Sequence, residues 1–242
     1  RLPSLLLLGY ATDSPPLDTE DLDLLDKTAH QVAAALENAR LYRQTHRRLQ
    51  ELRLLHEVAL ATSTLLDMEP ILARVLDALC RYIALDACAF FTVDQAQARL
   101  RGHPASRGLP TPPERITIPI GQGIAGWVAQ TGQPLLVPDV TGDPRHTALS
   151  HEDVRSKLCV PVWVGGHVVA VLELDSRRPD AFSREDLDLA SNVAGQLAVA
   201  MERQQVLQQA QQRVRELTAL MRMSSAIQAA TRLEEILDVV MD

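Results

Sequence analysis

Glycine and proline are distributed very unevenly along this chain of 242 residues. Nine of the 11 glycines and nine of the 14 prolines fall within residues 102–166, whereas residues 17–69 contain neither. Residues 180–242 contain only Gly195 and are rich in Ala, Leu, Gln, Glu and Arg. Because glycine and proline disfavour helices more strongly than other residues, this distribution predicts long helices at both ends, with turns and strands between them.

Helix-start signals agree with this prediction. Asp18 and Ser183 are residue types that cap helix N-termini well, and each is followed three residues later by an acid, Asp21 or Asp186. A helix from Asp18 to about residue 66 would be roughly 70 Å long at 1.5 Å per residue. A single compact domain cannot cover a helix of that length, so we expect it to connect two domains.

The two helical ends are also copies of each other. Residues 17–77 match residues 182–242 without a gap, at an offset of 165 residues, and roughly one position in three is identical. The unit is a whole domain and is too long for a solenoid repeat. We therefore expect the chain to contain the end of one domain, a complete second domain and the start of a third.

The C-terminal helix carries an apolar stripe, which we call the seam. Its residues follow the alternating spacing of three and four that places side chains on one helix face: Ala200, Leu207, Ala210, Val214, Leu217 and Met221. Polar residues such as Arg203 and Ser224 interrupt the same pattern. This pattern predicts a parallel homodimer through paired helices and not a strong autonomous coiled coil.

Composition excludes several classes of function. The net charge is −7 and the basic residues form no stripe, so we expect no nucleic-acid partner. No apolar run approaches the 20 or so residues that cross a bilayer, so we expect no membrane contact by this segment. Three cysteines, an odd number, argue against a disulfide framework and for a reducing, cytoplasmic location.

The middle of the chain reads as β structure. Runs of apolar and β-branched residues predict four strands: Ala87–Val93, Leu135–Val137, Leu158–Val164 and His167–Leu174. Gly165 and Gly166 predict a hairpin turn between the last two, and residues 124–130 predict a short helix. Alternation near Leu172–Leu174 predicts one covered sheet face and one partly polar face. The order predicts an α+β fold with an antiparallel sheet.

These segments together resemble a GAF domain, the small-molecule-binding sensory module of signalling proteins. The motifs occur in family order: LLHEVALATSTLLDMEPILARVL (54–76), DACAFFTVD (86–94), PIGQGIAGWVAQTGQPLLVPDVTGDPR (119–145), RSKLCVPVWVGGHVVAVLELDS (155–176) and AFSREDLDLASNVAGQLAVAMER (181–203). The resemblance implies a GAF/PAS-like central antiparallel sheet flanked by helices, with long inter-domain signalling helices at both ends.

Together with the repeat, the resemblance also predicts the domain boundaries. Residues 1–45 would be the C-terminal end of a preceding GAF domain, and residues 46–203 a complete GAF domain. Residues 204–242 would be a linker helix and the start of a third GAF domain.

In this family a ligand lies between one sheet face and a lid, which here would be residues 116–157. The resemblance implies where the ligand binds but leaves the ligand and any cofactor unknown. The ligand-pocket candidates that it implies lie on the lid and on the strands beneath it: Phe90, Phe91, Trp127, Asp139, Asp143, Arg145, His146, Cys159, Val171 and Glu173.

Several of these candidates have an ordinary structural alternative. Asp139, Asp143 and Arg145 either hold a polar ligand group or cap turns and pair locally, as Asp before Gly or Pro usually does. His146 and His151 fit no recognised zinc spacing, so we expect loop histidines and no metal site. Neighbouring strand residues alternate between faces, so one of Phe90 and Phe91 can line the pocket while the other packs under a helix.

Cysteine positions bear on enzymatic function. A branch resembling this family reduces free methionine sulfoxide with cysteines around the lid, and another attaches a bilin to a lid cysteine. Cys80 falls on a predicted helix, and Cys88 and Cys159 fall in apolar strands, so neither chemistry is expected. The cyclic-nucleotide signature Asn-Lys-Phe-Asp-Glu of some GAF domains is also absent.

The sequence therefore predicts a non-enzymatic sensory or regulatory segment of a larger signalling protein, such as a sensor histidine kinase. Its expected partners are an unidentified small molecule, a second copy of the chain, and neighbouring GAF and output domains in the same chain. The main alternative is a ligand-free relay that spaces and dimerises its neighbours. A redox enzyme resembling methionine sulfoxide reductases is a further alternative.

Overall fold

The computed structural model describes residues 18–64, 67–146 and 153–241. Their helices and strands follow one another as α1 (Thr19–Thr64), α2 (Met68–Tyr82), β1 (Ala87–Asp94), β2 (Arg99–Gly102), β3 (Thr117–Pro119), α3 (Gly123–Thr131), β4 (Leu135–Val137), β5 (Ser156–Val164), β6 (His167–Ser176) and α4 (Arg184–Met241). The chain forms two compact units, and the boundary between them lies between Arg53 and Leu54. The predicted long helices at both ends are confirmed.

Both long helices begin at the predicted caps. The Asp21 backbone N–H donates to Asp18 Oδ1 at 2.8 Å, and the Asp18 backbone N–H donates back to Asp21 Oδ2 at 3.2 Å. Ser183 and Asp186 make the same reciprocal pair at the start of α4, at 3.2 Å and 2.8 Å. These bonds satisfy backbone donors that a helix start otherwise leaves without partners.

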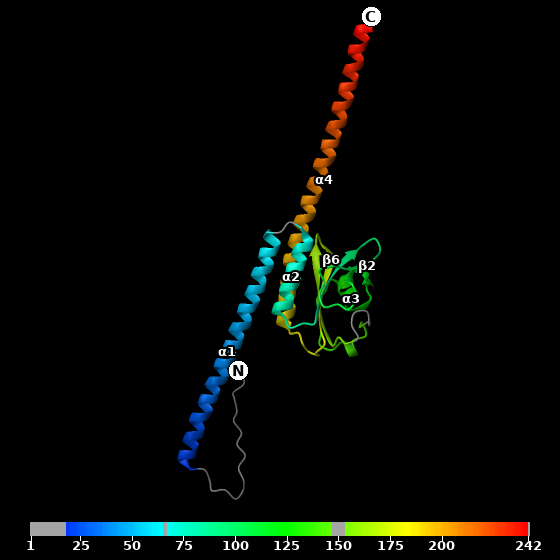
Figure 1. Cartoon of the computed structure of the whole chain (residues 1–242). Helices are drawn as coiled ribbons and strands as arrows, with labels where there is room; N and C mark the ends of the chain where they lie inside the picture. The colour runs from blue at the N-terminus through cyan, green and yellow to red at the C-terminus, as the bar shows by residue number, and fades with distance from the viewer. Residues whose placement is uncertain (1–17, 65–66, 147–152, 242) are drawn as a thin grey trace. The chain divides into compact units, whose positions relative to one another are not determined.

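The second unit, Leu54–Asp242, is built on a six-stranded antiparallel sheet with the strand order β3-β2-β1-β6-β5-β4 (Figure 1). Gly165 and Gly166 form the β5–β6 turn with φ of 58° and 80°, a left-handed conformation that glycine adopts without strain. The predicted α+β fold, central antiparallel sheet and hairpin are confirmed. The short strands β2 and β3 were not expected from the sequence.

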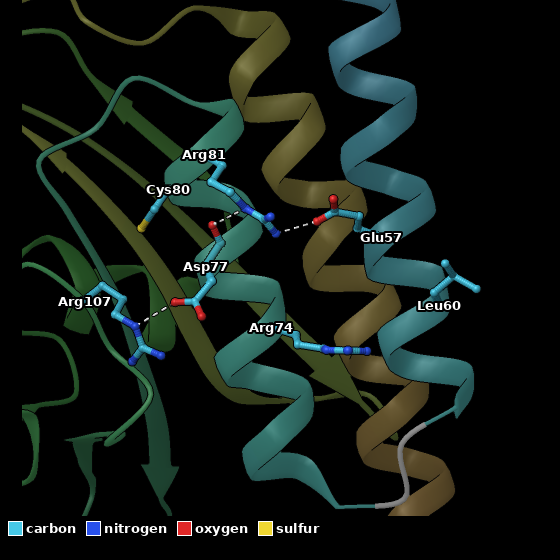
Figure 2. A pocket seen from close by; sticks show the side chains of 7 residues that line it. All are labelled: Glu57, Leu60, Arg74, Asp77, Cys80, Arg81 and Arg107. Atoms are coloured by element: carbon cyan, nitrogen blue, oxygen red, sulfur yellow. Dashed lines mark hydrogen bonds and ion pairs between the residues drawn. The ribbon is translucent and has the colours of Figure 1, made fainter.

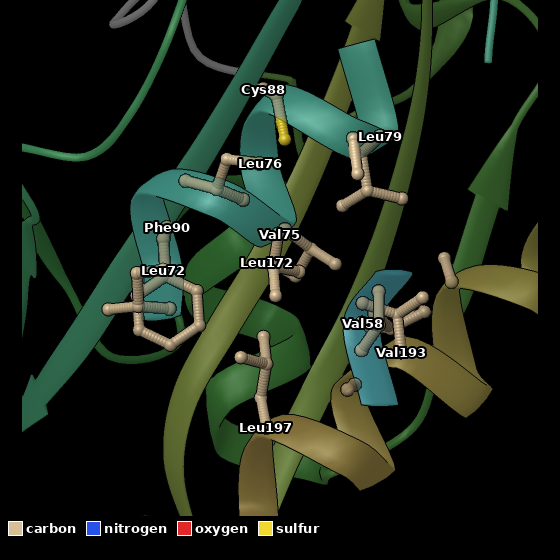
Figure 3. Close-up of a cluster of buried hydrophobic side chains, with 14 of the residues drawn as sticks. Val58, Leu72, Val75, Leu76, Leu79, Cys88, Phe90, Leu172, Val193 and Leu197 are labelled. Atoms are coloured by element: carbon tan, nitrogen blue, oxygen red, sulfur yellow. The ribbon is translucent and has the colours of Figure 1, made fainter. Parts of the chain in front are cut away.

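Helices α2 and α4 and the end of α1 cover one sheet face, which we call the helix face. Buried residues of α2 recur at helical spacing, and Leu72, Leu76 and Leu79 pack with Phe90 and Leu172 of the sheet (Figure 3). Fully burying one such side chain stabilises the fold by about 1.5–3 kcal/mol.

Helix α3 and the segments around it cover the opposite face, which we call the α3 face. Its apolar residues form a second buried cluster that includes Phe91, Ile124, Val128 and Val171. The sequence predicted one covered face and one partly polar face. The α3 face carries the polar residues, and it is buried as well. The polar side chains that alternate along β6 lie inside the protein.

The seam on α4 divides into two parts. Ala200 is 3% exposed and packs in the helix-face core, so its assignment to a dimer contact was wrong: its side chain already has an intramolecular partner surface. The other five seam residues are exposed on the continuing helix: Leu207, Ala210, Val214, Leu217 and Met221. No helix in the described part of the chain is long and apolar enough to cross a membrane.

Candidate functional site

Four polar side chains of β5 and β6 meet on the α3 face of the sheet. Lys157 is the register partner of Asp175, and Cys159 is the register partner of Glu173. Residues two apart on a strand point to the same face, so the four form a compact block across two neighbouring strands. We call it the charged cluster.

Lys157 lies between the two carboxylates. Its Nζ is 2.8 Å from Glu173 Oε1, 2.9 Å from Asp175 Oδ1 and 3.1 Å from Asp175 Oδ2. The Cys159 thiol donates to Glu173 Oε2 at 3.2 Å. The side chains of all three charged residues are at most 4% exposed. One buried cation therefore faces two buried carboxyl groups, which leaves an excess acid in the interior.

Burial and mutual repulsion determine the charge of the cluster. Burial, and then the Glu173 carboxylate, raise the pKa of Asp175 to about 7. Burial by itself would lower the pKa of Lys157, but the attraction of Glu173 and Asp175 outweighs it and raises that pKa. Lys157 is thus charged throughout the physiological range, while Asp175 exchanges a proton near neutral pH.

Cys159 is a poor nucleophile in this position. Burial, and then the nearby Glu173 carboxylate, raise the pKa of the Cys159 thiol well above its usual value. The thiolate is the reactive form of cysteine, so this side chain serves as a hydrogen-bond donor.

The predicted lid acids form local ion pairs. Asp139 caps the turn at Val140–Gly142 and pairs with Arg155, with 2.8 Å between Asp139 Oδ2 and Arg155 Nη2. The hydrogen bond from Arg155 is the main reason why the pKa of Asp139 lies well below its usual range. Asp143 accepts from Arg145 at 2.6 Å and 2.9 Å, which lowers the pKa of Asp143.

Arg145, Trp127 and His146 lie on the same side of the sheet as the charged cluster. The Arg145 guanidinium sits 4.9 Å from the centre of the Trp127 ring, in a cation–π contact. Burial, and then the positive charge of Lys157, lower the pKa of His146, while Glu173 opposes that change. His146 is therefore neutral near pH 7 and within electrostatic range of the cluster. His151 lies outside the described residues.

The two phenylalanines separate as alternation requires. Phe91 packs on the α3 face in the cluster that contains Val171. Phe90 packs on the helix face, with its ring edge-on to His103 at 6.0 Å between ring centres. Phe90 is thus removed from the set of ligand-pocket candidates, because the sheet lies between it and the charged cluster.

Sequence reasoning missed Lys157 and Asp175. The signals were present: Lys157 is one of two lysines in the chain and interrupts an apolar strand, and Asp175 follows Glu173 at strand spacing in another. No group of three His, Cys, Asp or Glu side chains within the described ranges could hold a metal ion.

A family model described as GAF domain matches residues 67–201. The chain is 25% identical over 141 residues to the probable 3',5'-cyclic phosphodiesterase pde-5 of Caenorhabditis elegans, covering 51% of this chain and 19% of that protein. It is 27% identical over 146 residues to the cone cGMP-specific 3',5'-cyclic phosphodiesterase subunit alpha' of Mus musculus, covering 54% and 17%. The matched region is thus a fifth or less of either relative.

Solved structures with the same fold include a free methionine-R-sulfoxide reductase from Neisseria meningitidis in complex with its substrate. The two chains superpose with a TM-score of 0.61 at 24% identity, covering 65% of this chain and 91% of the reductase. The GAF domain of a phosphoenolpyruvate-protein phosphotransferase from Coxiella burnetii gives 0.60 at 21% identity, covering 65% and 96%. At such identities the likeness establishes the fold alone.

Proposed function

Because this chain belongs to the GAF domain family, we propose that it is a sensory or regulatory segment that binds a small charged molecule within a larger signalling protein. The family match covers residues 67–201 and includes the whole sheet with its charged cluster. In both phosphodiesterase relatives the matched region is a fifth or less of the protein's length. This supports a regulatory module within a longer chain.

The charged cluster is the observation that carries this proposal. A buried ion pair usually contributes less to stability than apolar residues of the same volume would. Packing alone therefore does not explain why three ionisable groups are buried here. Lys157 can pair with an anionic group of a ligand, and Glu173 with a cationic one. Arg145 and Trp127 supply a charged and an aromatic surface on the same side.

The residues of the charged cluster, and not the names of the relatives, indicate a charged ligand. The phosphodiesterase matches do not bring the Asn-Lys-Phe-Asp-Glu signature with them, so we do not propose a cyclic nucleotide. The reductase likeness is one of fold, and the thiol of Cys159 is buried, with its pKa raised well above the ordinary value. We propose binding without catalysis.

A ligand screen tests the sensory function. We expect at least one charged metabolite to raise the melting temperature of the full 242-residue chain by several degrees, because a ligand at 100 times its Kd adds about 2.7 kcal/mol. Glu173→Gln should abolish the shift, while Glu37→Gln, on the exposed surface of α1, should leave it unchanged. Native mass spectrometry gives the stoichiometry. A screen without any binder, together with a dry core around Lys157, would favour the ligand-free relay.

We further propose that the chain relays the ligand state through dimeric helices, with a GAF domain at 46–203 between parts of its neighbours at 1–45 and 204–242. Leu207, Val214 and Leu217 are exposed on α4. The repeat places Tyr42, Leu49 and Leu52 at the equivalent positions of α1, and these are exposed as well. The equivalent segments of α1 and α4 thus expose the same apolar stripe to solvent. This supports pairing of the helices with those of a second chain.

Leu217→Glu tests the dimer. We expect it to weaken self-association at least about tenfold, because a charge replaces an apolar seam residue at a position where its partner copy would lie. Gln208→Glu, at an exposed position on the opposite helix face from Leu217, is the matched control. Light scattering or sedimentation over a concentration series measures both. A parent protein that stays monomeric at high concentration rules out the dimer.

A further inference from the structure

A second site lies on the other side of the sheet from the charged cluster. A cavity of about 810 Å³ opens between the end of α1 and α2 (Figure 2). Three arginines, two acids, a leucine and a cysteine line it: Glu57, Leu60, Arg74, Asp77, Cys80, Arg81 and Arg107. The lining carries a net positive charge in a chain whose total charge is −7. This cavity shares no lining residue with the charged cluster of the proposed ligand site.

Arg107 connects the parts of this cavity. Its Nε donates to Asp77 Oδ1 on α2 at 2.8 Å, and its Nη1 donates to the carbonyls of Ala105 and Ser106. Its backbone forms a β-bridge with Cys88, through hydrogen bonds of 2.9 Å and 2.7 Å. Arg107 thus holds β1 and α2 together, and its Nη2 makes no hydrogen bond to the described residues.

Two cysteines meet beside Arg107. Cys80 is exposed on α2, one turn after Asp77, and Cys88 is fully buried in β1, where Figure 3 shows it against α2. The neighbouring Cys88 thiol is the main cause that lowers the pKa of Cys80, and Arg107 acts in the same direction against burial and Asp77. Burial raises the pKa of Cys88 well above its ordinary value. The pair therefore has one accessible, activated sulfur and one protected sulfur.

We propose that Cys80 is a thiol-modification site that reacts with small anionic disulfides and passes the modification on as a Cys80–Cys88 disulfide. An accessible thiolate beside a cation is the arrangement that favours attack on a disulfide. The Nη2 of Arg107, which bonds to none of the described residues, provides a place for a carboxylate of the incoming molecule. The cavity is large enough to hold a compound of that size.

The reaction balances without any group beyond the disulfide. The Cys80 thiolate attacks one sulfur of R–S–S–R, the Cys80–S–R bond forms, and the leaving R–S⁻ takes up a proton. Cys88 then gives up its proton and its sulfur attacks the Cys80 sulfur, which releases the second R–S⁻ as a thiol. Two protein thiols are oxidised and one disulfide is reduced to two thiols. The product bond would join the last turn of α2 to the start of β1.

Three disulfides whose R groups carry different charges test the proposed reaction. Oxidised glutathione is anionic, bis(2-hydroxyethyl) disulfide is neutral and cystamine is cationic. We expect the native chain to lose two thiols, at Cys80 and Cys88 by peptide mapping, with no mass added at the end point. Cys88→Ser should stop at one mixed disulfide on Cys80, Cys80→Ser should not react, and Cys159→Ser should behave as the parent does.

Arg107→Met tests the preference for anions. We expect the parent to react roughly fivefold faster with oxidised glutathione than with the neutral disulfide, and the ratio to fall toward one in the variant. The ratio is internal to each protein, so a loss of stability does not imitate the effect. A parent that prefers cystamine overturns the ligand class. If Cys80 of the native chain reacts no faster than Cys159, the proposed site is overturned. If the parent protein ends as a mixed disulfide, the second step is overturned.

Discussion

Replacing Lys157 by methionine is expected to lower the free energy of unfolding by about 3–5 kcal/mol. The methionine nearly fills the volume, but Glu173 and Asp175 would then face each other in the interior with no cation between them. Protonation of the carboxyl groups relieves part of this penalty at low pH. We therefore expect the loss to be larger at pH 8 than at pH 5, as measured by urea denaturation of both proteins.

The chain supplies its own control for this experiment. Lys27, the other lysine, is 71% exposed and pairs with Asp23 across one helical turn at 2.6 Å. Lys27→Met should change stability by less than about 1 kcal/mol, because exposed pairs of this kind contribute little. A double replacement, Glu173→Gln with Asp175→Asn in the Lys157→Met background, should recover part of the loss. Equal effects at Lys157 and Lys27 would contradict the charged cluster as described.

Asp175→Asn is expected to change how stability depends on pH. The folded protein holds a proton on Asp175 up to about pH 7, whereas the unfolded chain releases it near pH 4. Between these values the folded state binds more protons, so the contribution of Asp175 is fully present below pH 4 and is lost as pH rises through 7. The loss is on the order of 4 kcal/mol and disappears in the variant.

The measurement is the difference in unfolding free energy between Asp175→Asn and the parent from pH 4 to pH 8. Other acids titrate alike in both proteins, including Asp139, whose lowered pKa acts in the opposite direction on total stability, and they cancel in the difference. The variant should gain on the parent steadily up to about pH 7 and then level off. A difference that does not vary with pH would show that Asp175 is ionised throughout.

Much of the fold follows from signals that are local in sequence. Residues 17–69 contain neither Gly nor Pro, and residues 180–242 contain only Gly195, which predicts the long helices α1 and α4. The Asp18 and Ser183 caps mark where these helices begin. The Gly165–Gly166 pair determines the β5–β6 turn. Strands β2 (RLRG) and β3 (TIP) escaped prediction because neither contains an apolar run like the LLV of β4. They gain their stability from neighbours across the sheet.

The candidate sites depend on the tertiary structure in a different way. Glu173 could be selected as a pocket residue by family resemblance, but nothing local to it reveals that Lys157, 16 residues earlier, lies 2.8 Å away. That contact follows from the register of β5 against β6. Phe90 was assigned to the pocket alongside Phe91, and only the placement of α2 against one face separates them.

The sequence by itself determined the helices, their caps, the hairpin and the family, because each depends on residue types at fixed short spacings. The tertiary structure decided which polar residues meet. It buried a lysine between two acids on one side of the sheet, and on the other it brought Cys80, Cys88 and Arg107 together from three separate segments. Those contacts arise from strand register and helix packing, so they exist only once the whole domain has folded.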